Sequence, residues 1–139
     1  MQPFSWKHLL TNTLIVFVIA EVANIALTAL GKALSNPPET FGPYLYSSVI
    51  VLTAVGIIAA AIGYVVARYY YKSDAAKADR WFFIAGVVLL VVSFYPDIAL
   101  PWSSDPDQVG WTYGIMANLM LMHVVAFVPV AYFYRRERI

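Results

Sequence analysis

Four long apolar stretches determine what this chain can fold into. They lie at 9–31, 45–67, 81–102 and 112–134, and the second and fourth contain no Asp, Glu, Lys or Arg. About 20 helical residues cross the hydrocarbon core of a bilayer. Inside that core every backbone N–H and C=O must be bonded within the protein, which an α-helix achieves by itself. The sequence therefore predicts an all-α integral membrane protein with four transmembrane helices, surrounded by the lipid bilayer.

The composition excludes a water-soluble protein. Hydrophobic residues make up 61% of the 139 residues and charged residues 12%, against roughly 45–50% and about 25% in soluble domains. A chain of this length cannot bury so much apolar surface in water. The net charge of +1 gives no reason to expect a nucleic-acid partner. We expect one transmembrane domain over residues 1–139.

The sequence offers little for catalysis or cofactor binding. It has no cysteine, which excludes disulfides, thiolate metal sites and cysteine nucleophiles. It also lacks a P-loop, a Gly-rich dinucleotide motif, an HExxH motif and a nucleophile elbow. His8 and His123 are expected at different depths, so a haem held by two histidines would need His123 from two copies, a minor alternative. We therefore expect no enzyme activity, no cofactor and no metal site.

The connections between the stretches are short and hold most of the charged residues. Helices joined by short connections lie antiparallel beside each other. Short cytoplasmic loops carry the excess of Lys and Arg. With the N-terminus inside, eight of the nine basic residues are cytoplasmic and only Lys32 is outside. The eight are Lys7, Arg68, Lys72, Lys77, Arg80, Arg135, Arg136 and Arg138. We predict both termini in the cytoplasm.

Cysteine labelling tests this orientation. A cysteine at Ser104, before the fourth span, is expected to react with a membrane-impermeant maleimide added to intact cells. A cysteine at Ser73, between the second and third spans, is expected to react only after the cells are permeabilised. The chain has no cysteine of its own, so each variant carries a single thiol. Labelling of only the Ser73→Cys variant in intact cells would contradict the orientation.

Tryptophan and tyrosine residues gather near the ends of the four stretches. Their amphipathic rings prefer the interface between headgroups and hydrocarbon, so we expect them to anchor the helices there. These residues are Trp6, Tyr44, Tyr46, Tyr69, Tyr70, Tyr71, Trp81, Trp102, Trp111, Tyr113, Tyr132 and Tyr134.

Glu21 is the one acid in the middle of an apolar stretch. It is the thirteenth residue counted from Leu9, which places it near the bilayer midplane, where an acid facing lipid costs roughly 2.5–3.5 kcal/mol. We expect it to face protein, with Asn24 and Thr28 on the same helix face. Burial disfavours the charged form of the carboxyl group unless a cation or several donors compensate. The apolar run resumes after Glu21, so we expect a retained span and not a cleaved signal peptide.

His123 is the expected partner of Glu21. It is the twelfth residue counted from Thr112 and the only other titratable side chain predicted near the midplane. A contact between Glu21 and His123 is therefore expected. Asn118 lies closer to the outside on another part of the fourth helix.

Two further helix faces carry a pattern. Gly86, Leu90, Ser93 and Asp97 share one face of the third stretch. Pro96 is expected to kink or end that helix and to free a carbonyl group. The second stretch carries a stripe of small residues, which we interpret as a helix-packing surface. The stripe consists of Gly56, Ala60, Gly63 and Ala67.

Two resemblances rest on short motifs. The third and fourth stretches resemble an uncharacterised family of small bacterial four-span membrane proteins, a domain of unknown function. They do so through Ser93–x–x–Pro96 and the pair Met122–His123, together with Asn24. This resemblance implies the bacterial cytoplasmic membrane and no particular activity. Separately, Ala20–Glu21–Val22 in the first helix is similar to the small multidrug resistance transporters, whose glutamate in the first helix couples drug and proton.

Two classes of function fit the candidate residues Glu21, Asn24, Asp97 and His123. In the first, Glu21 and His123 bind a small ligand or a cation, or exchange protons, as in a transporter. Such a protein is expected to form a homo-oligomer or to join a membrane complex, because four helices enclose little volume. In the second, the protein is a non-catalytic accessory, assembly or structural subunit. Its polar side chains then only bond helices together, which most simply explains Asn24, Thr28, Ser93 and Asn118.

Overall fold

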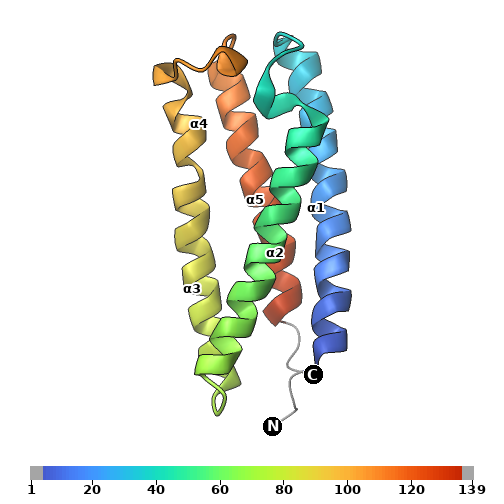
Figure 1. The fold of residues 1–139 in the computed structure, drawn as a ribbon, viewed down its shortest axis with the longest axis vertical. Helices are drawn as coiled ribbons and strands as arrows, with labels where there is room; N and C mark the ends of the chain where they lie inside the picture. The colour runs from blue at the N-terminus through green and yellow to red at the C-terminus, as the bar shows by residue number, and fades with distance from the viewer. Residues whose placement is uncertain (1–4, 136–139) are drawn as a thin grey trace.

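The computed structural model describes residues 5–135, and its long helices run antiparallel along one common axis (Figure 1). The long helices are α1 (Trp6–Ser35), α2 (Tyr46–Tyr70), α3 (Ala75–Ser93) and α5 (Tyr113–Arg135). A short helix, α4 (Tyr95–Ala99), follows α3. Within the described residues four segments are long and apolar enough to span a membrane, α3 and its continuation to Trp102 counting as one. The predicted all-α fold with four apolar helices is confirmed.

The helices extend past the predicted spans at the charged connections. The expected turn over residues 68–80 is confined to residues 71–74, because α3 begins at Ala75 and not at 81. Asp74 starts α3 by accepting a hydrogen bond from the Lys77 N–H at 2.9 Å. Hydropathy indicates which residues can face lipid. The helix itself extends beyond them, as far as the residues at which it is capped, when the residues in between favour a helix.

The break at Pro96 is confirmed. α3 ends at Ser93, and α4 begins at Tyr95 with Pro96 in its first turn. Proline has no N–H, so the Val92 carbonyl loses its helical partner. The Ser93 hydroxyl donates to the Leu90 carbonyl at 2.7 Å. The short segment after the break turns Asp97 into the bundle, where it is buried.

Short 3-10 helices complete the connections at the upper end of Figure 1. They are η1 (Gly42–Tyr44), η2 (Leu100–Trp102) and η3 (Pro106–Gln108). η1 lies against η3, so the two upper connections support each other. Gly110 has a φ of +93°, and a Cβ there would meet Pro38 at 2.7 Å. A side chain at position 110 would be strained by the positive φ and would collide with Pro38, and glycine avoids both problems.

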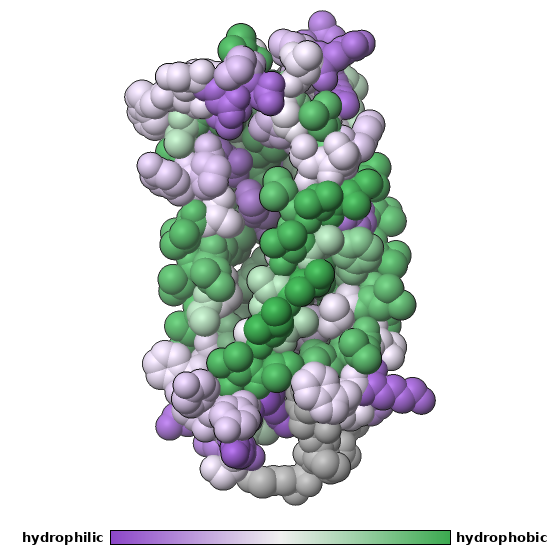
Figure 2. Space-filling model, in the orientation of Figure 1, coloured by the Kyte–Doolittle hydropathy of each residue, from purple (hydrophilic) through white to green (hydrophobic). Residues whose placement is uncertain are grey.

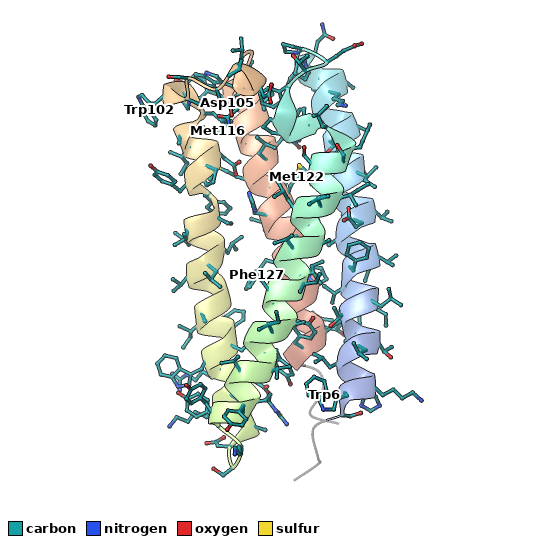
Figure 3. All side chains as sticks on the ribbon, viewed as in Figure 1. Trp6, Trp102, Asp105, Met116, Met122 and Phe127 are labelled. Atoms are coloured by element: carbon teal, nitrogen blue, oxygen red, sulfur yellow. The ribbon has the colours of Figure 1, made fainter. Side chains whose placement is uncertain are left out.

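The buried apolar residues form two separate clusters. We call the cluster at the end where α1 begins the lower core. It consists of Leu9, Val16, Ala20, Ile57, Tyr64, Phe82, Val130 and Tyr134. The upper core lies at the end with the 3-10 helices and consists of Phe41, Tyr44, Val49, Leu100, Ile115, Leu119 and Met122. In Figure 3 Met122 lies nearer than Phe127 to the end marked by Trp102 and Asp105.

The four spans surround these cores unequally. α1 packs against α2 and α5, and α3 packs against the same two helices, so α1 and α3 occupy opposite corners. The buried residues of α3 are Ala78, Asp79 and Phe82, all in its first turns. Farther along, the predicted face is turned inward but half-covered: Gly86 and Leu90 are intermediate in exposure, and the Phe127 ring lies against Gly86. The outer surface shows a broad hydrophobic band (Figure 2).

The small-residue stripe of α2 does not pack within this chain as expected. Gly56 and Gly63 are exposed, and a Cβ at Gly56 would meet nothing within 4 Å. Ala60 and Ala67 are partly buried against the lower core. The four residues share one face of α2, and this face lies at the border of the packed side, with its alanines half-buried and its glycines exposed.

Two of the expected anchors are buried instead. Trp6, Trp102 and Tyr70 are largely exposed near the helix ends, as an interfacial role requires. Tyr44 and Tyr134 are fully buried. Their rings fill the upper and lower cores, so the prediction that they face the membrane interface is wrong.

Candidate functional site

A layer of buried polar side chains separates the two cores. On α1, Glu21, Asn24 and Thr28 follow Ala20 of the lower core and are buried. On α2, Thr53 is buried between Val49 of the upper core and Ile57 of the lower core. We call Glu21, Asn24, Thr28 and Thr53 the polar layer. It lies between apolar clusters, where an unpaired polar group is costly.

Contacts between α1 and α5 fix the depth of each residue. The Thr13 and Tyr134 hydroxyls are 2.8 Å apart near one end. Toward the other end the Thr28 hydroxyl oxygen lies 3.9 Å from the Met122 sulfur. The helices are antiparallel and both rise about 1.5 Å per residue. Four contacts between them, including those of Asn12 with the Phe133 carbonyl and of Asn118 with the Leu27 carbonyl, place Asn24 near the depth of His123 and Glu21 near that of Ala126. The predicted similar depth of Glu21 and His123 thus agrees with the helix register.

Asn24 joins α1 to α2. Its Nδ2 donates to the Thr53 hydroxyl at 3.0 Å, and its backbone carbonyl accepts from the Thr28 hydroxyl at 2.9 Å. The side chain is 4% exposed, and its Oδ1 is buried without a hydrogen-bond partner among residues 5–135. The Asn24 Nδ2 therefore donates to Thr53, whereas the Asn24 Oδ1 accepts no hydrogen bond within the described residues.

Glu21 is buried without compensation. It is 7% exposed, and both carboxyl oxygens lack a hydrogen-bond partner in the described part of the chain. The structure brings Glu21 and His123 to similar depth but forms no hydrogen bond or ion pair between them within that part. Sharing a depth is not enough, because the two side chains leave their helices in different directions.

His123 pairs with Asp97. The His123 Nε2 lies 3.3 Å from the Asp97 Oδ2, which forms no hydrogen bond within residues 5–135, and the Phe94 ring packs on the imidazole in a T-shaped arrangement. The Asp97 side chain is 10% exposed and that of His123 is 41% exposed. The Pro96 break positions this carboxylate, since it starts α4 beside α5. The pair links the α3–α4 span to α5 and has one side open to the surroundings.

Tyr44 and Asn118 form a second polar junction above the polar layer. The Asn118 Nδ2 donates to the Tyr44 hydroxyl at 2.8 Å and to the Leu27 carbonyl at 3.0 Å. Burial raises the pKa of the Tyr44 phenol, and the hydrogen bond from Asn118 opposes this with a smaller effect. Tyr44 therefore stays neutral and fastens η1 to α1 and α5.

Sequence reasoning missed three of these residues. Thr53 looks like any threonine in an apolar helix, and only its depth opposite Asn24 could have indicated it. Tyr44 follows three prolines and a glycine in the connection, a context that suggested a loop anchor. Asp79 was placed in a charged turn, yet it is buried in α3 with Arg68 Nη1 3.9 Å from its Oδ1.

No family model matches the chain, and no match was found among curated proteins or solved structures. The resemblances built on Ser93–Pro96, Met122–His123 and Glu21 therefore stay predictions. The fold and the apolar helices show a small polytopic membrane protein.

Proposed function

We propose that this protein binds a cation or a proton at Glu21 inside the bilayer and uses that site in proton- or cation-linked transport. One observation carries the proposal. Glu21 Oε1, Glu21 Oε2 and Asn24 Oδ1 are buried, lie one helical turn apart, and have no donor within residues 5–135. Three acceptors without a donor are complementary to a positively charged ligand.

The energetic argument favours a functional role for Glu21. Replacing a buried polar group by a packed apolar one is often neutral or stabilising, so packing alone does not require a glutamate here. Ionisable residues inside membranes are costly and mark ion or proton pathways. The Glu21 carboxylate can take up a proton, which makes it neutral, or it can hold a cation. Either form relieves the cost of burial.

His123 and Asp97 extend the proposed site toward the surface. The imidazole can both accept and donate a proton, it lies at the depth of Asn24, and part of it is exposed. Its Nε2 lies 3.3 Å from the Asp97 Oδ2, an oxygen with no hydrogen-bond partner among residues 5–135. In this proposal His123 passes protons between Glu21 and the surroundings, and Asp97 orients the ring.

The setting of the site belongs to the same proposal. The distribution of Lys and Arg favours cytoplasmic termini, and the resemblance to bacterial four-span proteins favours the cytoplasmic membrane of a bacterium. A homo-oligomer, or a place in a larger membrane complex, would supply the volume that four helices lack.

The alternative is an accessory or assembly subunit whose polar side chains only join helices. The bonds of Asn24 to Thr53 and of Asn118 to Tyr44 favour it, because each links two separate elements. Such bonds are common between membrane helices. They leave the two Glu21 oxygens unexplained.

Proton flux into liposomes tests the proposal. The protein is reconstituted around a pH-sensitive dye, and a pH step is applied with valinomycin and K⁺ to balance charge. The wild-type protein is expected to equilibrate pH faster than empty liposomes, and Glu21→Gln to fall to the empty rate. Glu39→Gln, which changes an exposed acid in the α1–α2 connection, should match the wild type, and His123→Ala should be slowed. Equal flux in all variants would leave only the accessory role.

A further inference from the structure

We propose that the site at Glu21 and Asn24 takes a partly dehydrated alkali metal cation, Na⁺ or Li⁺, and that Thr53 orients the Asn24 amide for it. This inference rests on the proposed function and names its ligand. A proton needs one oxygen, whereas a metal cation needs several oxygens arranged around it.

The free atoms of the site are all hard oxygen ligands. Glu21 contributes two carboxyl oxygens and Asn24 its Oδ1, and all three are buried without a donor in the described residues. The donor half of the Asn24 amide is already bonded to Thr53 at 3.0 Å. Carboxylate and carbonyl oxygens favour hard cations, and the chain has no thiolate to favour a soft one.

A proline in α5 leaves a further backbone oxygen without its helical donor, near the depth of Glu21. Pro129 lies inside α5 and is buried. It has no N–H, so the Val125 carbonyl, one turn earlier, lacks its helical donor. The contacts between α1 and α5 place Val125 within about one helical turn of the depth of Glu21. Carbonyls freed in this way coordinate ions in membrane transporters.

The charge of the site selects a monovalent ion. Glu21 is the one acid of the polar layer, and Asp97 is engaged with His123. One carboxylate and one monovalent cation make a neutral pair. A divalent ion would leave a net positive charge between two apolar cores, where uncompensated charge is costly.

The hydrogen bond to Thr53 leaves the Oδ1 end of the Asn24 amide without a partner among residues 5–135. The Thr53 hydroxyl holds Nδ2 on the α2 side, so Oδ1 stays available. Without that acceptor the amide can turn over and donate Nδ2 to the Glu21 carboxylate, which would then compete with the cation. Thr53 is thus a positioning residue that need not touch the ion.

Proton release on adding salt tests this inference. The full-length protein in lipid nanodiscs is titrated with NaCl in a weak buffer containing a pH indicator, with choline chloride at equal ionic strength as the control. A cation that takes the place of the Glu21 carboxyl proton sets that proton free, so Na⁺ is expected to release a proton from the wild type and none from Glu21→Gln. Thr53→Val should bind Na⁺ about tenfold more weakly, the effect of losing one oriented hydrogen bond. Thr53→Ser, which keeps the hydroxyl, should restore the wild-type affinity.

Melting in choline chloride separates orientation from folding. Thr53→Val is expected to lose Na⁺ affinity beyond any change in its melting temperature. If Thr53→Val cannot be purified, Asn24→Ala is used, and it too should weaken Na⁺ binding. Unchanged Na⁺ affinity in the variant used would overturn the inference. Absence of Na⁺-driven release from the wild type, alongside Glu21-dependent proton flux, would also overturn it and leave the proposed function standing.

Discussion

Gly31→Ala is expected to lower the free energy of unfolding by about 2–4 kcal/mol, the sum of an overpacked contact and disturbed buried hydrogen bonds. Gly31 is buried on α1. A Cβ there would collide with the Tyr44 hydroxyl and lie 2.6 Å from the Asn118 Nδ2. These two groups are bonded to each other and fasten η1 to α5. Tryptophan fluorescence during thermal unfolding in detergent measures the loss.

Gly56→Ala is the matched control, because it adds the same methyl group to a glycine in another transmembrane helix. Nothing lies within 4 Å of a Cβ at Gly56. Alanine favours a helix over glycine by about 1 kcal/mol, so this variant should be as stable as the wild type or more so. Equal melting of the two variants would show that the junction of Tyr44 and Asn118 is not closed as described.

Glu21→Leu is expected to raise the free energy of unfolding by about 1–3 kcal/mol while abolishing proton flux. Its carboxyl oxygens have no partner in the described residues, so leucine removes a desolvation cost and adds apolar contact between the two cores. Functional sites often sacrifice stability in this way. Thermal melting and the liposome assay on the same preparation give both quantities.

Glu39→Leu provides the control for this substitution, since it removes an exposed acid from a connection and should change neither quantity appreciably. A large loss of stability in Glu21→Leu would contradict the expectation. It would show that the carboxyl group is bonded in the folded protein.

Residue type along the chain was enough to predict the membrane spans and the break at Pro96. Hydropathy over about 20 residues measures suitability for lipid directly, and proline lacks the N–H that a helix needs. The burial of Glu21, Asn24 and Thr28 on one face follows from their spacing in the same way. These features are local, so sequence carries them.

The partners of the polar side chains could not be predicted from depth alone. Glu21 and His123 lie at similar depth, but the rotation of each helix decides which neighbour a side chain meets. α5 lies between α1 and α3, and His123 faces the α3–α4 span, where the short α4 presents Asp97. Helix rotation depends on the packing of all four spans, which no single stretch encodes.

The same reason explains the stripe of α2 and the buried tyrosines. Small residues permit close packing without determining which helix approaches, and α1 and α3 approach on the alanine side. A tyrosine near a helix end suits both the interface and a core, provided that its hydroxyl finds a partner. Tyr44 finds Asn118, and Tyr134 finds Thr13.

Unfolding of this bundle need not be a single cooperative event. The lower and upper cores share no residue, and proteins open in units that coincide with contiguous packed clusters. The end that carries the connecting 3-10 helices can therefore loosen while the aromatic contacts of Tyr64, Phe82 and Tyr134 hold the other end together. Glu21 lies at the boundary between the two units. It would meet water in such a partly open form without loss of the whole fold.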